Sequence, residues 1–258
     1  MGDTIITLYD IPGTTPTNAW SPNVWIARFA LAMKGLAFKT VWIEYPDIAP
    51  ELQKLGIGPT TSGDGSTQYT LPALHDPRTG TLIADSLAIV EYLDETYPSA
   101  GGVTFFPAGT RALQRAWRAA FNARLLAADL SRLMVYITLK QLNPSSVEYF
   151  QRTRQISYEK PLEELAPAGS DERAVIIKTF VKGLSELAKW LDEANGEGSV
   201  FVMGDKGPTY ADVLMAGWLI FVRVCAGEES DVWQAVIASS GGRWERYMAE
   251  FKKWEIVV

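Results

Sequence analysis

The stretch Trp20-Ser21-Pro22-Asn23-Val24-Trp25 lies where a loop rich in turn formers gives way to a helical pattern. Ser is a favoured helix N-cap and Pro is favoured at the first helical position, so a helix is predicted over residues 24–34. Capping a helix is the commoner use of a serine at this place. A second use is also open, in which the Ser21 hydroxyl and the free N–H groups of the first turn face an anion.

The composition describes a globular protein with a sizeable core. The 258 residues are 47% hydrophobic and 21% charged, and the formal net charge is −6. An acidic chain disfavours nucleic acid and anionic membranes as general partners. We find no run of 18 apolar residues and no apolar leader with a cleavage site, so a cytoplasmic protein that does not enter a membrane is expected.

Cysteine and histidine are too rare for several common site types. Cys225 is the single cysteine and lies in an apolar run, so no intrachain disulfide is possible and a buried thiol is expected. His75 is the single histidine. We therefore predict no metal site of the Cys/His kind.

The first part of the chain alternates strand and helix patterns in the order βαβαββα. The apolar run that contains Pro72 fits a strand, and this proline, which cannot donate to a sheet ladder, fits a strand start or an edge. The predicted strands cover residues 5–9, 38–44, 69–75 and 81–84, and the predicted helices cover residues 24–34, 48–55 and 87–96.

After residue 98 the pattern becomes helical, and no convincing strand follows. We divide the chain into a domain at 1–98, a linker at 99–109 and an all-helical domain at 110–258. The residues at 111–142 predict one long helix or a kinked pair, and Pro161 is expected to kink or divide a helix at 147–165. Further helices are predicted at 171–194, 211–226, 232–238 and 243–253, with the tail at 254–258 packed back on the body.

Four features, in this order and at these separations, resemble the glutathione transferase superfamily over essentially the whole chain. They are Ser21-Pro22 at a helix start, Leu71-Pro72, Asp85-Ser86 after the last strand, and the capping sequence Thr209-Tyr210-Ala211-Asp212. Each is weak alone, but the change from α/β to all-helical strengthens the match. Within the superfamily, the Trp-Ser-Pro-Asn-x-Trp run is similar to the fungal class A enzymes, which are related to bacterial β-aryl etherases.

The resemblance implies a thioredoxin-like N-terminal domain, an all-α C-terminal domain and glutathione as co-substrate, without a metal. It assigns Ser21 the catalytic position, and it assigns glutathione binding to Leu71, Pro72, Asp85 and Ser86. In the family, the residue before a cis-proline pairs with the cysteinyl unit through its backbone, and the acidic-Ser pair holds the γ-glutamyl end. Asn23 is a further candidate contact that would otherwise face solvent. Family members are usually homodimers, and we expect one here.

Ser21 would act as a hydrogen-bond donor and would not attack. The glutathione thiol has a cysteine-like pKa near 8.5, so only a few per cent is thiolate at neutral pH. A depression of about two pKa units, or about 2.7 kcal/mol, makes it mostly ionised. A hydroxyl donor and a helix N-terminus together supply a stabilisation of that size. No Gly-x-Ser-x-Gly elbow surrounds Ser21 and no motif joins it to His75, so a serine hydrolase is not predicted.

Cysteine occupies the equivalent position in related enzymes that exchange disulfides, whereas serine cannot form a mixed disulfide. We therefore expect conjugation of small aromatic electrophiles, with peroxide reduction and aryl-ether cleavage as further options, and poor reductase activity. The apolar ligand site is expected between Trp20 and Pro22 and the first helix of the second domain. There the candidates at helical spacing are Trp117, Phe121, Arg124 and Leu125, although such a stripe is more often core.

Two other functions remain open from the sequence. The resemblance also suggests ligandin behaviour, in which the protein binds flat polyphenols such as flavonoids without turnover. A non-catalytic carrier of this kind would keep the same site, so the sequence does not separate it from a transferase. A relative with a vestigial glutathione site is disfavoured, because Ser21, Asp85 and Ser86 are all present.

Overall fold

The N-terminal half folds around a four-stranded sheet. The computed structural model describes residues 5–61, 65–98 and 100–258. The strand order is β2-β1-β5-β6, in which β1 and β2 are parallel and the other neighbours are antiparallel. A right-handed crossover through a helix is the usual connection between such parallel neighbours. The strands are β1 (Ile6–Asp10), β2 (Phe38–Trp42), β5 (Ala73–Asp76) and β6 (Thr81–Ala84).

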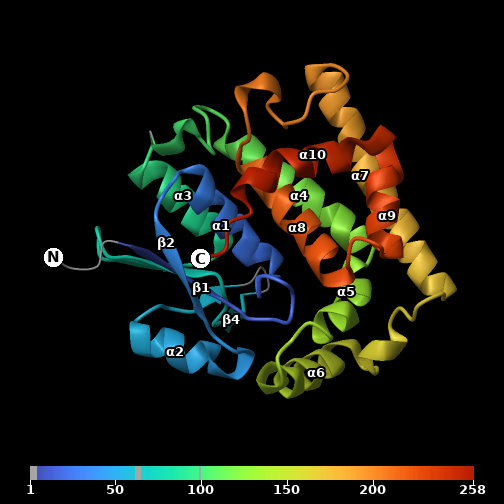
Figure 1. Ribbon diagram of the computed structural model, residues 1–258, viewed down its shortest axis with the longest axis horizontal. Coiled ribbons are helices and arrows are strands. Elements are labelled where there is room, and N and C mark those ends of the chain that lie inside the picture. The colour runs from blue at the N-terminus through green and yellow to red at the C-terminus, as the bar shows by residue number, and fades with distance from the viewer. Residues whose placement is uncertain (1–4, 62–64, 99) are drawn as a thin grey trace.

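Helices cover both faces of this sheet. Figure 1 shows α1 (Pro22–Met33) and α3 (Ser86–Thr96) on one side and α2 (Ile48–Leu55) on the other. The predicted βαβαββα order is therefore confirmed. The sequence analysis missed one feature, a small hairpin of β3 (Thr60–Thr61) and β4 (Thr67–Gln68) inside the loop after α2. Two-residue strands carry too little pattern to be found from sequence.

In the second half, every secondary-structure element that the structure describes is a helix. Its most buried helix is α8, in which nearly every side chain is inside the protein. Several of the other helices pack against it (Figure 1), and the predicted all-α domain is confirmed. The helices are α4 (Arg111–Ala127), α5 (Leu130–Leu139), α6 (Pro144–Tyr158), α7 (Asp171–Asn195), α8 (Tyr210–Ala226), α9 (Asp231–Ala238) and α10 (Arg243–Phe251).

The boundaries of the helices at residues 111–158 agree with the sequence prediction except at the start of α6. The region 111–142 is the kinked pair α4 and α5, separated at Asp129, whose φ of 50° is left-handed. Helix α6 ends at Tyr158, before Pro161, as expected. It begins earlier than predicted because Asn143 precedes Pro144 at the first helical position. From the sequence, this pair predicts only the end of the preceding helix.

The two halves meet where α1 packs along α8. Gly217 of α8 makes the close approach possible: a Cβ there would lie 2.7 Å from Ile26 Cγ1 and 2.8 Å from the Pro22 carbonyl oxygen. The C-terminal tail also returns to the sheet, where the Val258 carbonyl accepts a hydrogen bond from the Thr40 N–H at 2.9 Å. The predicted packing of the tail on the body is therefore confirmed.

Candidate functional site

A pocket of about 550 Å³ opens between the N-terminus of α1 and helix α6. Its walls come from the loop after β1 and the start of α1, the turn before α2 with the first residues of that helix, β4 with the segment after it, and the middle of α6. The lining residues are Ile11, Trp20, Ser21, Pro22, Asn23, Tyr45, Pro46, Ile48, Ala49, Thr67, Gln68, Tyr69, Thr70, Leu71, Tyr149, Thr153 and Arg154.

Ser21 is the N-cap residue of α1, and its side chain does not serve the helix. The residue is extended (φ −60°, ψ 124°), is 6% exposed and makes no side-chain capping hydrogen bond. Among the described residues no other group bonds its hydroxyl. The Trp25 N–H donates to the Ser21 carbonyl at 2.9 Å, and Pro22 has no N–H, so the amides of Asn23 and Val24 remain as the helix-terminal donors.

The segment before β5 offers a second polar surface to the pocket. The Leu71–Pro72 peptide bond is cis, the alternative that the resemblance had favoured. Leu71 lines the pocket, and neither its N–H nor its carbonyl is hydrogen-bonded within the part of the chain that the structure describes. An extended chain segment could therefore pair with it as an added strand.

Asp85 and Ser86 begin α3 beside this segment. The Asp85 N–H donates to the Pro72 carbonyl at 3.3 Å, and one Asp85 carboxylate oxygen accepts from the Ala88 N–H at 2.9 Å. Asp85 has a φ of 84°, an uncommon conformation for a non-glycine residue that is typical of functional sites. Ser86 is buried at the first helical position. Pro72, Asp85 and Ser86 do not line the pocket itself. Pro72 follows Leu71 in the chain, and its carbonyl joins this segment to Asp85.

The opposite wall is aromatic and is fixed to α6 by a polar clamp. The Glu44 carboxylate accepts a 2.8 Å hydrogen bond from the Asn143 side chain and another from the Ser146 hydroxyl. The Ser146 hydroxyl also accepts from the Tyr45 N–H at 2.9 Å. This clamp holds the Tyr45 ring stacked on Tyr149, with centroids 6.0 Å apart and an interplanar angle of 14°.

Trp20 completes this wall from the side of α1. Its ring centroid lies 6.3 Å from that of Tyr45, and its indole N–H donates to the Pro12 carbonyl at 3.3 Å. Burial raises the pKa of Tyr45 to about 12, with the nearby Arg154 charge acting against this effect. Tyr45 is therefore a neutral phenol at physiological pH.

Comparison with known proteins identifies the family to which this fold belongs. Residues 20–96 match the family model described as "Glutathione S-transferase, N-terminal domain", and residues 112–254 match "Glutathione S-transferase, C-terminal domain". The chain belongs to the glutathione S-transferase family. The superfamily predicted from the sequence, and the fold it implied, are confirmed.

Solved and curated members of the glutathione S-transferase family align over nearly the full length. A glutathione S-transferase of Ceriporiopsis subvermispora, solved in complex with glutathione, is 42% identical with a TM-score of 0.91, covering 98% of this chain and 99% of that one. Glutathione transferase GSTFuA3 from Phanerochaete chrysosporium is 38% identical with a TM-score of 0.89 and 98% coverage of both chains. The glutathione S-transferase-like protein ustS of Aspergillus flavus is 30% identical over 95% of this chain and 91% of its own length.

Within this glutathione S-transferase fold, the aromatic stripe of α4 does not line the pocket. Trp117 packs edge-on against Trp190 of α7 at 6.0 Å, and the Arg124 guanidinium lies 4.3 Å from the same ring. Phe121 and Leu125 are buried in the core. The expectation that these four residues form the pocket wall is corrected, because the apolar face of α4 is taken up by α7 and α8.

The wall is supplied instead by Tyr45 and by Tyr149, Thr153 and Arg154 of α6, all of which the sequence analysis missed. A weak signal was present, since Tyr149 and Thr153 are four residues apart on one helical face. Their partner Tyr45 lies about a hundred residues earlier in the chain, so only the tertiary structure brings the wall together.

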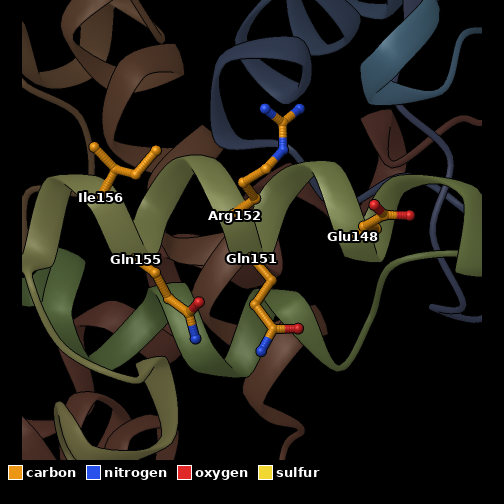
Figure 2. Close-up of a pocket in the computed structure, with 5 residues that line it drawn as sticks. All are labelled: Glu148, Gln151, Arg152, Gln155 and Ile156. Atoms are coloured by element: carbon orange, nitrogen blue, oxygen red, sulfur yellow. The ribbon is translucent and has the colours of Figure 1, made fainter.

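A second depression lies on another face of α6. It measures about 470 Å³ and is lined by Glu148, Gln151, Arg152, Gln155 and Ile156, all from this one helix. Figure 2 shows Arg152 and Glu148 projecting from one side of the helix and Gln151 and Gln155 from the other. It shares no lining residue with the pocket at Ser21.

Three further observations concern the part of the chain that the structure describes. Cys225 is buried, as predicted, and burial raises the pKa of its thiol. No helix in the described residues is long and apolar enough to cross a membrane. No group of three or more His, Cys, Asp and Glu side chains in residues 5–61, 65–98 and 100–258 is arranged to hold a metal ion.

Proposed function

We propose that this protein transfers glutathione to small aromatic electrophiles and that Ser21 stabilises the attacking thiolate. The observation that carries the proposal is the unused hydroxyl of Ser21, buried at the N-terminus of α1 and on the pocket wall. The hydroxyl makes no capping hydrogen bond, so both its proton and its oxygen are free to meet a ligand in the pocket, and the amides of the first turn add positive potential at the same place.

Glutathione would be held along the surface that runs from Leu71 to α3. The unbonded N–H and carbonyl of Leu71 fit the backbone of the cysteinyl unit. The Asp85 carboxylate fits the amine, and Ser86 at the helix start fits the γ-glutamyl carboxylate. Asn23 is exposed within the pocket and is near enough to add a polar contact. The glutathione named with the Ceriporiopsis subvermispora structure supports this ligand.

The chemistry follows from the thiolate. Its sulfur attacks an electrophilic carbon of a substrate that lies against the rings of Trp20, Tyr45 and Tyr149, with Pro22 closing the edge. The leaving group departs with its electron pair, and the thiol proton passes to solvent. Peroxide reduction and aryl-ether cleavage are further reactions of the same nucleophile.

A second function, the binding of flat polyphenols without turnover, is favoured by the stacked pair of Tyr45 and Tyr149. This proposal places the ligand on the aromatic wall and does not need Ser21. The identities to the Ceriporiopsis subvermispora and Phanerochaete chrysosporium proteins support the fungal class A subclass. We further propose a homodimer in the cytosol, where glutathione is reduced.

Calorimetry with glutathione at several pH values tests the central proposal, followed by turnover of chlorodinitrobenzene. We expect binding in the micromolar to millimolar range with release of a proton, and conjugation above the uncatalysed rate. Flavonoid binding without any glutathione binding would reject the transferase and support the carrier. Sedimentation tests the dimer separately.

A further inference from the structure

The pocket carries a single formal charge. Among the described residues that line it, Arg154 is the one side chain charged at neutral pH, although the chain as a whole has a net charge of −6. Nothing in the proposed catalysis by Ser21 uses this charge. A cation kept in an otherwise neutral pocket favours a ligand that brings an anion.

Arg154 is not neutralised by an acidic side chain of the described residues. Other arginines of this protein have such partners, for example Arg28, whose guanidinium lies 2.8 Å from the Asp10 carboxylate. Arg154 instead lies 3.4 Å from the Thr153 hydroxyl, 4.9 Å from the Phe150 ring centroid and near the Tyr45 hydroxyl. These partners are all neutral, so the guanidinium retains donors for a charged group.

The charge lies on the aromatic wall and not at the start of α3. Arg154 is half-buried on the same helix as Tyr149, whose ring stacks on Tyr45. A planar ring placed against these side chains would bring a substituent on its edge toward Arg154. A guanidinium binds a carboxylate through two parallel hydrogen bonds, which fixes orientation as well as charge.

We propose that Arg154 is a specificity residue that binds the carboxylate of an acidic aromatic substrate while the ring lies on the Tyr45–Tyr149 wall. This inference rests on the proposed glutathione transfer and narrows its substrate class. Glutathione itself has carboxylates, and one of them is the alternative occupant of Arg154. The position of Arg154 on the aromatic wall favours the second substrate.

A matched pair of electrophiles isolates the carboxylate. Chlorodinitrobenzoate and its carboxamide share the same ring and leaving group. In each, the glutathione sulfur bonds to the ring carbon that bears chlorine, the carbon–chlorine bond breaks, and chloride leaves with the electron pair. The variants are Arg154→Gln, which removes the charge, and Arg154→Lys, which keeps it. Arg152→Gln makes the same charge change on the same helix (Figure 2) from outside the pocket. Because the Arg152 guanidinium lies 5.7 Å from the Tyr149 ring, this variant also controls for an indirect effect through the wall.

We expect wild type to prefer the acid, and we expect Arg154→Gln to lower kcat/KM for the acid on the order of tenfold while the amide changes less than twofold. Arg154→Lys should recover part of the loss, and Arg152→Gln should behave as wild type. The preference should weaken with added salt. An equal rise in the KM for glutathione with both electrophiles would assign Arg154 to glutathione and overturn the proposal.

Binding without reaction separates this inference from the proposed function. Calorimetry with the unreactive dinitrobenzoate and dinitrobenzamide needs neither glutathione nor turnover. Acid binding that is lost in Arg154→Gln supports the inference even if no conjugation occurs. If wild type binds the acid and the amide equally well, the inference about Arg154 is rejected. If wild type also conjugates the amide normally, the proposed function still stands.

Discussion

At the scale of single residues, Ser21 is a favoured capping residue whose side chain faces the pocket and does not cap its helix. Its hydroxyl lines the pocket, and its carbonyl alone engages α1 through the Trp25 N–H. Because the hydroxyl faces the pocket and makes no hydrogen bond within the described residues, it is free to donate to a ligand held there. On this interpretation, the chemical identity of the side chain at position 21 determines which reaction occurs.

Replacing the oxygen by sulfur should change the reaction. In Ser21→Cys, the thiol at the helix N-terminus becomes a nucleophile that can form a mixed disulfide with glutathione. We expect conjugation of chlorodinitrobenzene to fall on the order of tenfold and release of glutathione from a mixed disulfide to rise by at least that factor. Ser21→Ala is the control and should gain no disulfide activity. Equal disulfide activity in both variants would show that the side chain at position 21 does not determine which reaction the protein catalyses.

At the scale of elements, the contact between α1 and α8 positions the site. Gly217 faces the first turns of α1, and a methyl group there would overlap Ile26 and the Pro22 carbonyl. We predict that Gly217→Ala lowers the free energy of unfolding by about 1–3 kcal/mol, because the helices must separate. Chemical denaturation measures this change. Gly58→Ala is the control, since its Cβ would meet nothing within 4 Å, and a loss equal to that of Gly217→Ala would contradict the packing argument.

The capping box of α8 gives a pH dependence with a definite sign. Asp212 is fully buried and accepts hydrogen bonds from the Thr209 and Val202 amides. Burial raises the pKa of Asp212 to about 6, although these hydrogen bonds act to lower it. Its contribution to the free energy of unfolding is therefore fully present at pH values below the ordinary pKa of an aspartate and is lost as the pH rises through about 6. The cost of Asp212→Asn should therefore be larger near pH 4 than near pH 7.

The exposed Asp231 is the control, with the opposite sign. Hydrogen bonds from Arg173 lower the pKa of Asp231. Its contribution to the free energy of unfolding is therefore present at pH values above the ordinary pKa of an aspartate and is lost on acidification. The cost of Asp231→Asn should thus be smaller near pH 4. Thermal denaturation of both variants across this range measures the two trends, and the same trend in both would show that the burial of Asp212 does not control its titration.

These elements also show how far sequence reasoning reaches. Caps, prolines and apolar periodicity are local, and they predicted the start of α1, the division at Pro161 and the box at Thr209 and Asp212. The wall of the pocket depends on contacts such as Glu44 with Asn143, which join positions far apart in the chain. An apolar stripe such as that of α4 does not reveal whether a helix or a ligand covers it.

At the scale of the whole molecule, the two halves should unfold together. The α1–α8 interface is continuous with both cores, and the tail binds β2 through Thr40. We predict that the most protected amides of α1 and α8 exchange hydrogen with the same free energy of opening. Native-state hydrogen exchange with increasing denaturant measures it. Separate opening of α8, while α1 stays protected, would contradict a single cooperative unit.

The proposed function also requires the two halves to act as one, because the pocket takes Ser21 and Leu71 from the first and Tyr149 and Arg154 from the second. Under this proposal the thiolate would form on one side of the pocket and the electrophile would lie against the other. Changes in α6 should therefore alter the choice of electrophile, whereas changes at Ser21 should alter the ionisation of glutathione whatever the electrophile.

The most direct test of the account is a pH titration of bound glutathione in wild type and Ser21→Ala, followed by the ultraviolet absorbance of the thiolate. We predict that wild type holds the thiol pKa about two units below its free value near 8.5 and that Ser21→Ala moves it most of the way back, a difference of about 2.7 kcal/mol at the most. A thiol pKa that is equally depressed in both proteins would contradict the central role of Ser21 and leave the helix N-terminus as the source of the effect.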